Sequence, residues 1–264
     1  MTAWARYPYD GTVVLVTGGG SGIGRAIARA FAAQGALVAV AGRRAAPLDE
    51  TLEGFEEAHT LPVVADVASV DGVAAAIDAV IDRWGRLDVV VANAGTSEPG
   101  TIDDLDAAAW ERMRSVNVDG LIHLARAAAP HLRASRGNLL VMSSVAGFGG
   151  DWNQAGYNAT KGAVNALVQS MALDLGRDGV RVNAIAPAFT ATALTQERLD
   201  DPAFHAKLLD RIALDRPATP DDIARAALFL ASPDAAYITG VILPVDGGTT
   251  ASVGTPRPLA KESA

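Results

Sequence analysis

Short runs of apolar residues alternate along the chain with longer stretches in which apolar residues recur at helical spacing. The short runs are 13–16, 37–41, 62–65, 89–92, 138–142, 180–185 and 241–245. Most of them are rich in β-branched residues and apolar at odd and even positions alike, which is typical of strands buried on both faces. Each run therefore predicts one strand of a parallel sheet.

The stretches between these runs predict helices. Three alanine-rich examples are 23–33, 73–84 and 163–175. Because strands and helices alternate about six times, we expect an α/β fold: a Rossmann-like, doubly wound parallel sheet of about seven strands with helices on both faces. No proline- or serine-rich linker and no internal repeat interrupts the pattern, so residues 1–264 predict a single domain with a core at about 10–250.

Composition and charge exclude several classes of protein. The chain has no cysteine, which rules out a disulfide framework, a thiolate metal site and a cysteine nucleophile. Its formal net charge of −8 and the lack of a basic patch argue against nucleic-acid binding. No run approaches the ~18 apolar residues of a membrane span, and residues 1–11 lack the apolar region of a signal peptide. We therefore expect a cytoplasmic protein that binds neither nucleic acid nor membrane.

The titratable residues predict no metal site. The four histidines are scattered, and His123 and His131, which share one helical region, have no third ligand nearby. The acidic cluster at Asp103, Asp104 and Asp106 precedes a helix, where negative charge suits the helix dipole.

A glycine-rich loop follows the first predicted strand and leads directly into a helical pattern. Its residues are Thr17, Gly18, Gly19, Gly20, Ser21, Gly22, Ile23 and Gly24. Glycines make the turn tight, let the backbone approach a pyrophosphate and let the helix pack close to the strand. The helix N-terminus offers free N–H groups and partial positive charge to the phosphates. The loop predicts a dinucleotide site; taken alone, it is also compatible with a turn that merely tolerates glycine.

The end of the second predicted strand selects between the two nicotinamide dinucleotides. Many NAD enzymes carry an acidic residue there, which accepts hydrogen bonds from the ribose 2′-hydroxyl. In this chain Gly42 takes that position, and Arg43 and Arg44 follow. Because guanidinium groups match a 2′-phosphate, NADP(H) is favoured as the cofactor, with NAD(H) as the alternative. A solvated basic turn is the other interpretation of the two arginines.

Tyr157 and Lys161 stand four residues apart at the start of a helical pattern, so their side chains lie on one helix face. An unperturbed tyrosine has a pKa near ~10, too high for a good base at neutral pH. A neighbouring ammonium favours the phenolate and lowers that pKa, which would make Tyr157 competent as a general acid or base. By itself the spacing is also that of an ordinary surface pair.

Further polar groups fall at the carboxyl ends of predicted strands, where doubly wound folds bind ligands. Ser144 follows the fifth strand, thirteen residues before Tyr157, and residues 93–95 close the fourth strand at the same edge. Asn117 lies within a helical stretch, where a solvated or internally bonded amide is the simpler interpretation. Each signal alone is weak, but together and in this order they predict a catalytic site.

The chain resembles the single-domain short-chain dehydrogenases/reductases over about residues 10–250. The motifs that carry the resemblance are Thr17-Gly18-x-x-x-Gly22-x-Gly24, Asp66-Val67, Asn93-Ala94-Gly95, Asn117, Ser144, Tyr157 with Lys161, Pro187, Tyr237-Ile238-Thr239-Gly240 and Val245-Asp246-Gly247-Gly248. The resemblance implies an NAD(P)-binding Rossmann domain and an oxidoreductase of the EC 1.1.1 type that moves hydride between nicotinamide and a small ketone or secondary alcohol. It also implies a homo-oligomer, a tetramer or a dimer.

The resemblance implies roles for single residues as well. Tyr157 would give its proton to a carbonyl in reduction and take one up in alcohol oxidation, while Lys161 would lower its pKa and bind the nicotinamide ribose. Ser144 would hold the substrate oxygen, and Asn117 would anchor a water chain for the proton. The implied cofactor contacts are the glycine loop, Asp66 and Val67 at the adenine, Asn93, Ala94 and Gly95 beside the cofactor, and Pro187 and Thr192 at the nicotinamide.

One position departs from the family pattern: Ala188 stands where glycine usually follows the proline. If that position requires a positive φ, the loop must start differently, which bears on the assignment of Thr192. Residues 188–212 are predicted to form a lid over the substrate, and residues 251–264 a polar tail. The predicted substrate pocket consists of Thr96, Val145, Trp152, Gln154 and Phe189, and loop packing is the alternative for each of them.

Other functions compete on the same scaffold. A 3-oxoacyl-thioester reductase or a sugar/polyol dehydrogenase would differ only in substrate. A sugar-nucleotide epimerase or dehydratase is disfavoured by the short chain and by the spacing of the glycine loop. A non-enzymatic dinucleotide sensor would keep the loop without needing the proton-transfer groups, all four of which are present here.

Overall fold

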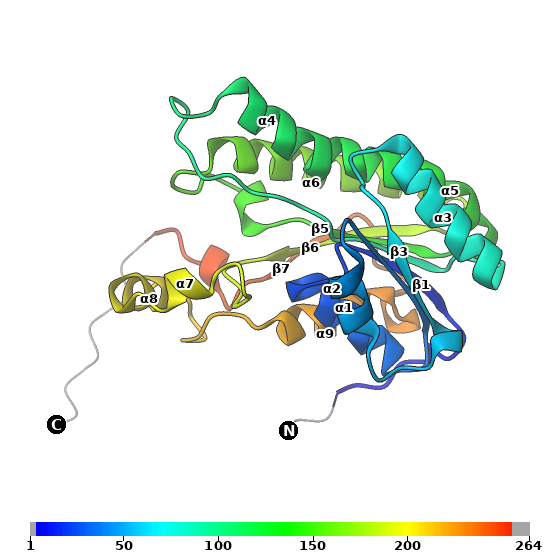
Figure 1. Ribbon diagram of the computed structural model, residues 1–264. Coiled ribbons are helices and arrows are strands. Elements are labelled where there is room, and N and C mark those ends of the chain that lie inside the picture. The colour runs from blue at the N-terminus through cyan, green and yellow to red at the C-terminus, as the bar shows by residue number, and fades with distance from the viewer. Residues whose placement is uncertain (1–3, 255–264) are drawn as a thin grey trace.

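A parallel sheet of seven strands forms the centre of the computed structural model, which describes residues 4–254 (Figure 1). The strands are β1 (Val13–Thr17), β2 (Leu37–Gly42), β3 (Thr60–Val64), β4 (Val89–Ala92), β5 (Asn138–Met142), β6 (Arg181–Pro187) and β7 (Ile242–Val245). They lie in the order β3-β2-β1-β4-β5-β6-β7, and every neighbouring pair is parallel. The predicted α/β class and doubly wound sheet are confirmed.

Helices cover both faces of this sheet. They are α1 (Gly22–Ala32), α2 (Ala45–Leu52), α3 (Val70–Trp84), α4 (Ala107–Arg114), α5 (Gly120–Ser135), α6 (Ala155–Gly176), α7 (Gln196–Leu199), α8 (Pro202–Leu209) and α9 (Pro220–Ala231). In Figure 1, α3, α4, α5 and α6 form the upper layer and α1, α2 and α9 the lower one. The short helices α7 and α8 project to the left of the view, away from both layers.

The burial of the strands follows from this sandwich. All residues of β1, β4 and β5 are buried, which accounts for apolar residues at both odd and even positions. In contrast, β3 lies at the edge of the sheet and alternates between covered and exposed residues. Two strand boundaries differ by two residues from the predicted runs, and the other boundaries differ by at most one. Strand β6 continues to Pro187 because its ladder with β7 extends to Pro187 and Val245, and β3 begins two residues before its apolar run.

Local signals set the helix boundaries. The Ser69 side chain accepts a hydrogen bond from the Gly72 amide at 3.2 Å, so α3 begins three residues before its apolar pattern. A capping box of Thr219 and Asp222 starts α9. A π-helical turn, Ser115–Asp119, separates α4 from α5. Such turns are often found at functional sites.

The order of the strands places the candidate site. Strand order reverses between β1 and β4, and ligands of open α/β sheets bind in the crevice at the carboxyl ends of such strands. The glycine loop follows β1 and residues 93–95 follow β4, so the two segments meet at this crevice. Ser144 follows β5, the next strand along the sheet.

No helix in the described range is long and apolar enough to cross a bilayer. Of the tail predicted over 251–264, residues 255–264 lie outside the described part of the chain.

Candidate active site

The glycine loop adopts a backbone that only glycine accommodates at its first and last positions. Gly18 has a φ of +64°, and a Cβ there would lie 2.9 Å from the Asn93 side-chain nitrogen. At Gly24, a Cβ would lie 2.3 Å from the Gly18 carbonyl oxygen. Because both distances are shorter than a real contact allows, the loop passes from β1 into α1 without space for side chains.

The loop is bonded to the end of the neighbouring strand β4. The Asn93 side chain donates to the Thr17 carbonyl at 2.9 Å and to the Gly18 carbonyl at 3.2 Å. In return, the Thr17 hydroxyl accepts the backbone amides of Asn93 and Ala94 at 3.1 and 3.2 Å. These bonds fix the two walls of the crevice relative to each other.

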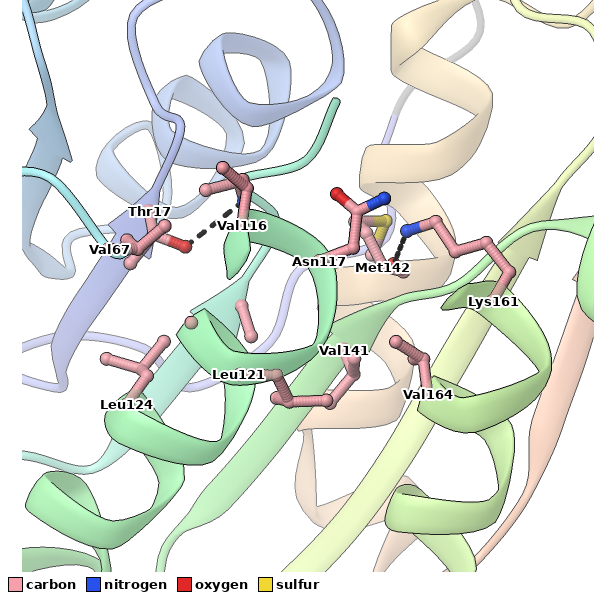
Figure 2. A pocket seen from close by; sticks show the side chains of 13 residues that line it. Thr17, Val67, Val116, Asn117, Leu121, Leu124, Val141, Met142, Lys161 and Val164 are labelled. Carbon is pink, nitrogen blue, oxygen red and sulfur yellow. Dashed lines mark hydrogen bonds between the residues drawn. The ribbon is translucent and has the colours of Figure 1, made fainter. Parts of the chain in front are cut away.

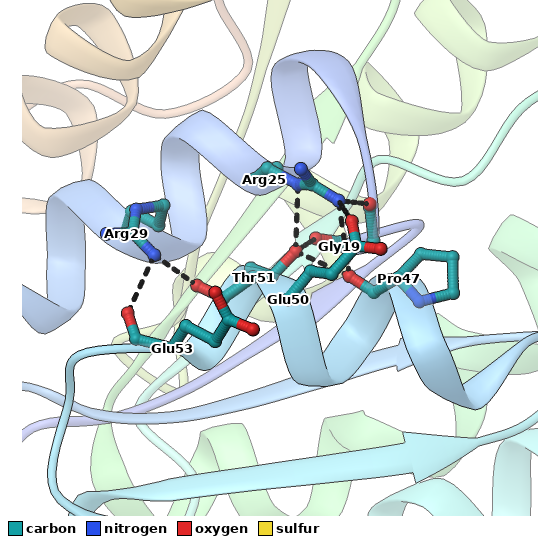
Figure 3. Close-up of polar contacts among 8 residues, drawn as sticks. Gly19, Arg25, Arg29, Pro47, Glu50, Thr51 and Glu53 are labelled. Atoms are coloured by element: carbon teal, nitrogen blue, oxygen red, sulfur yellow. Dashed lines mark hydrogen bonds and ion pairs between the residues drawn. The ribbon is translucent and has the colours of Figure 1, made fainter.

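A second set of contacts holds the loop from the side of α2 (Figure 3). The Thr51 hydroxyl, which is fully buried, bonds to the Gly19 carbonyl and the Pro47 carbonyl, each at 2.9 Å. Arg25 donates to the Gly20 carbonyl at 2.7 Å and to the Glu50 carboxylate at 2.9 Å. No local sequence signal marks Thr51 and Arg25, because the groups that they bind lie in other segments of the chain.

Arg25 is occupied by these bonds, whereas Arg43 and Arg44 are not. Both arginines are exposed just after β2, and neither has a hydrogen-bond or ion-pair partner among residues 4–254. Gly42 ends the strand and contributes no charge. Two free guanidinium groups therefore follow directly after Gly42, the position where an NAD enzyme would carry a carboxylate.

The crevice residues fit a dinucleotide. The Ser21 side chain makes no capping bond, so the first N–H groups of α1 remain available to an anion. Beyond β3, Val67 is buried and Asp66 is exposed, with its carboxylate accepting the Ala68 amide at 3.0 Å. A glycine-rich loop, open N–H groups and unpaired cations are features that suit a pyrophosphate and a 2′-phosphate.

Lys161 is buried at the other wall of the crevice, with 5% of its surface exposed. Its ammonium Nζ donates to the Met142 carbonyl at 2.7 Å, at the end of β5 (Figure 2). The same atom lies 5.6 Å from the centroid of the Tyr157 ring, one helical turn earlier on α6. Burial lowers the pKa of Lys161 to about 8, because the charged form loses its hydration.

The pKa of Tyr157 differs from the expectation that its neighbouring lysine lowers it. Burial of the phenol raises its pKa above 10.0, a hydrogen bond with Ser144 opposes this rise, and the Asp151 carboxylate adds to it. Desolvation thus outweighs the other influences. Tyr157 is therefore held in its neutral, proton-donating form at neutral pH.

Asn117 lies buried in the π-helical turn and uses its amide to join two segments of the site. Its oxygen accepts the Thr96 amide at 2.8 Å, and its nitrogen donates to the Thr96 carbonyl at 2.8 Å and to the Thr160 hydroxyl at 3.1 Å. The Thr160 hydroxyl in turn donates to the Tyr157 carbonyl at 2.8 Å. Asn117 thereby ties the loop after β4 to the first turn of α6. The water chain predicted for it stays a prediction.

A small cavity of about 10 Å³ lies among Lys161, Asn117, Met142 and apolar side chains of β4, β5 and α5 (Figure 2). This volume is on the scale of a single water molecule. A ketone or secondary alcohol is larger than this cavity.

Within residues 4–254, no hydrogen bond or ring contact joins two residues of the predicted substrate pocket. The Ser97 hydroxyl bonds to the Gln154 side chain at 3.0 Å, which joins the loop after β4 to the start of α6. Trp152 is 93% exposed and covers nothing. Phe189 packs against Phe204 of α8, with ring centroids 5.4 Å apart. Places for Trp152 and Phe189 against the substrate stay predictions.

The departure at Ala188 does not strain the lid. Among residues 4–254, positive φ outside glycine occurs at Arg136, Asn153 and Asp215, so Ala188 has an ordinary backbone. Thr192 reaches the glycine loop: a Cβ on Gly22 would lie 3.4 Å from its methyl carbon. The start of the lid therefore touches the predicted cofactor loop.

Within residues 4–254, no three His, Asp or Glu side chains gather as a metal site would require. Tyr157, Lys161 and Ser144 stand together where β5 meets α6.

A fold with this crevice and these groups defines a dinucleotide-dependent oxidoreductase. The family model described as enoyl-(acyl carrier protein) reductase matches residues 18–250. Meso-2,3-butanediol dehydrogenase of Serratia marcescens is 39% identical over 253 residues, which cover 94% of this chain and 98% of that protein. Galactitol 2-dehydrogenase (L-tagatose-forming) of Cereibacter sphaeroides is 38% identical over 244 residues, which cover 91% of this chain and 96% of that protein.

Among solved structures, 3-ketoacyl-(acyl-carrier-protein) reductase from Brucella melitensis complexed with NADH superposes with a TM-score of 0.85. It is 33% identical, and the match covers 92% of this chain and 99% of that one. The chain therefore belongs to the short-chain dehydrogenase/reductase family, as its motifs indicated. It is an enzyme that acts on CH–OH or C=O groups with a nicotinamide dinucleotide.

Proposed function

We propose that this enzyme reduces a ketone, or oxidises the corresponding secondary alcohol, with Tyr157 as the general acid and base. The observation that carries the proposal is the junction of α6 with the end of β5. There Lys161 lies one turn from Tyr157 and donates to the Met142 carbonyl at 2.7 Å, while Ser144 acts on the Tyr157 phenol and opposes the rise of its pKa. An acid, a cation and a hydroxyl donor therefore converge on one point at the open edge of the sheet.

The residues divide the work of proton transfer. The dinucleotide, when bound, supplies or accepts the hydride. Ser144 donates a hydrogen bond to the substrate oxygen and stabilises the negative charge that develops on it. Tyr157, which is neutral at pH 7, gives its proton to that oxygen during reduction and takes it back during oxidation. The Lys161 ammonium, charged below about pH 8, stabilises the phenolate left behind.

NADP(H) is the cofactor proposed for this site, with NAD(H) as the alternative. The support is the pair of unpartnered guanidinium groups at Arg43 and Arg44, together with the uncharged Gly42 at the end of β2. The glycine loop and the N-terminus of α1 would hold the pyrophosphate, and Asp66 and Val67 would lie at the adenine.

The proposed substrate is a small ketone or secondary alcohol. The names of the two curated relatives, a butanediol and a galactitol dehydrogenase, support an alcohol with a second hydroxyl nearby. A 3-oxoacyl thioester is the alternative substrate class, because the similar Brucella protein is named as a 3-ketoacyl-(acyl-carrier-protein) reductase. Self-association and a cytoplasmic location belong to the same proposal; light scattering and cell fractionation test them.

The deciding experiment is a screen of diols, polyols, hydroxyketones and 3-oxoacyl thioesters at 340 nm, with NADPH and NADH in parallel. The best substrate is then offered to Tyr157→Phe, which keeps the ring and removes the acid. We expect kcat to fall by about 10²- to 10⁴-fold, with the dinucleotide Kd unchanged. Turnover at the wild-type rate in this variant contradicts the assignment of Tyr157.

A further inference from the structure

We infer that Asn165 is a positioning residue for Ser144, because it bonds to the turn that carries Ser144 from both sides. The inference rests on the proposed function, in which Ser144 binds the reacting oxygen. Asn165 belongs to α6, two turns beyond Tyr157 and one beyond Lys161.

Asn165 brackets Ser144 with two hydrogen bonds. The Ser143 hydroxyl donates to the Asn165 side-chain oxygen at 2.5 Å, directly before Ser144 in the chain. The Asn165 side-chain nitrogen donates to the Gly147 carbonyl at 2.9 Å, three residues after Ser144. One amide therefore uses its acceptor on one flank of the turn and its donor on the other, which fixes its orientation.

The bracketed segment is a tight turn, the 3-10 turn η3 (Val145–Gly147). The Ser144 hydroxyl accepts the Ala146 amide at 3.2 Å, and the Ser144 carbonyl accepts the Gly147 amide at 2.9 Å. Because the ends of this turn are held by Asn165, Ser144 has one backbone position relative to α6. Catalytic groups need placement within about 0.5 Å, and the residues that support them provide it.

The turn packs closely against α6 at Gly147. A Cβ on Gly147 would lie 2.6 Å from the Asn165 nitrogen and 2.8 Å from the Lys161 carbonyl oxygen. The turn therefore rests directly on α6. Ser143 is 4% exposed, so its hydroxyl has no access to bulk water as a substitute partner. Loss of the Asn165 amide would leave a buried donor and a carbonyl unpaired, and the turn would shift to satisfy them.

Successive turns of α6 hold successive residues of the β5 end. Tyr157, Lys161 and Asn165 recur at four-residue spacing and so share one face of the helix. Lys161 bonds to the Met142 carbonyl, and Asn165 bonds to Ser143, the next residue along. Lys161 and Asn165 thus make polar contacts with two consecutive residues at the end of β5, and the second contact sets the place of Ser144.

A double-mutant cycle tests whether Asn165 acts through Ser144. Asn165→Leu keeps the volume and removes both bonds; we expect kcat to fall about 10- to 100-fold with a smaller change in KM, since the contact of Ser144 strengthens in the transition state. Ser144→Ala should lose about 10²- to 10³-fold. In the Ser144→Ala background, Asn165→Leu should cost less than about 3-fold, because its effect is already lost.

Gln169→Leu is the matched control: it makes a similar change one turn further along α6, at an exposed side chain with no partner within residues 4–254. It should leave kcat unchanged. Ser143→Ala removes one of the two bonds from the opposite side, and its loss should also vanish in the Ser144→Ala background. Equal losses from Asn165→Leu with and without the Ser144 hydroxyl would overturn the inference.

Hydrogen exchange separates this inference from the proposed function. The amides of Ala146 and Gly147 report on the turn, since both bond to Ser144. They should exchange faster in Asn165→Leu and Ser143→Ala than in wild type or Gln169→Leu. A wild-type enzyme that turns over no carbonyl or alcohol contradicts the proposed function, whereas unchanged exchange in both variants contradicts the positioning by Asn165.

Discussion

The ammonium group of Lys161 is buried inside the protein. The residue is 5% exposed, a carbonyl is its hydrogen-bond partner among residues 4–254, and its pKa falls to about 8. A buried ammonium with no carboxylate beside it in this part of the chain weakens the fold, and we propose that the same group stabilises the Tyr157 phenolate. Activity and stability therefore make opposite demands on this single residue.

Lys161→Met should separate these demands. We expect kcat/KM to fall by about 10²- to 10⁴-fold, because the phenolate loses its cation. At pH 7 the free energy of unfolding should rise by on the order of 1–3 kcal/mol, because a buried charge is replaced by an apolar chain of similar length. Steady-state kinetics and urea unfolding of the same preparation measure both effects. A variant that is less stable than wild type would refute the second expectation.

The stability gain of Lys161→Met should depend on pH. Below about pH 8 the lysine is protonated in the native and unfolded states alike, so the full cost of burying the charge is present. Between about 8 and its ordinary value of 10.5, the native state releases the proton while the unfolded state keeps it. Wild-type stability therefore rises with pH across this window, and the advantage of the variant shrinks there.

We propose that the residues after β2 decide between NADP(H) and NAD(H). Arg43→Ala with Arg44→Ala should raise the KM for NADPH by about tenfold or more and leave the KM for NADH nearly unchanged, since only the former carries a 2′-phosphate. Gly42→Asp should move the preference toward NADH, since a carboxylate there bonds to the ribose hydroxyl and repels the phosphate. Equal effects on both dinucleotides would show that these residues do not read the 2′ position.

At the scale of elements, α2 acts as a support for the glycine loop. Thr51→Val keeps the shape of the side chain and leaves the Gly19 carbonyl without its 2.9 Å partner. We expect a loss of about 1–3 kcal/mol in unfolding free energy and a several-fold rise in the dinucleotide Kd. Thermal unfolding and fluorescence titration with NADPH measure the two quantities. Thr51→Ser, which restores the hydroxyl, should recover both.

The strands, the helices and their alternation along the chain were predictable, because the sequence patterns that indicate them are local. Runs with apolar residues at odd and even positions alike form β1, β4 and β5. The strand–glycine–helix pattern corresponds to the loop between β1 and α1. The boundaries were less predictable, since they depend on neighbours: β6 reaches Pro187 because β7 pairs with it that far.

Within the candidate site, the motif residues were predictable and their supports were not. Tyr157 and Lys161 are visible as a spacing on one helix. The bonds of Asn117 to Thr96 and of Asn165 to Ser143 join residues 21 and 22 positions apart, and only the fold brings them together. The raised pKa of Tyr157 was also missed, because desolvation depends on what packs around the phenol.

Across the whole molecule, the two ends of the parallel strands serve different purposes. The crevice with its polar groups lies at the carboxyl ends of the strands, whereas the segment before β1 packs against α1 and α9. Tyr9 is 3% exposed, meets the edge of the Phe31 ring at 4.8 Å between centroids and donates its hydroxyl hydrogen to the Leu228 carbonyl. This segment stabilises the fold at a distance from the chemistry.

Tyr9→Ala should therefore weaken the fold without changing catalysis. We expect a loss of about 3–5 kcal/mol in unfolding free energy from the cavity left behind, and about 1–3 kcal/mol for Tyr9→Phe, which leaves the Leu228 carbonyl unpaired. Urea unfolding measures both. At a temperature where each variant is folded, kcat and the KM for NADPH should equal those of wild type. A change in kcat for Tyr9→Phe would contradict this separation.

The buried bond between Ser143 and Asn165 also constrains how such a sequence can diverge. Replacing Asn165 alone leaves the buried Ser143 hydroxyl without a partner, whereas exchanging both residues for apolar ones leaves only the Gly147 carbonyl unpaired. Changes at these two positions should therefore be correlated: relatives should keep the polar pair or lose it at both positions. A sequence that keeps only one of the two polar residues is the least stable of the three arrangements. Among related sequences, those with only one of the two should therefore be rare.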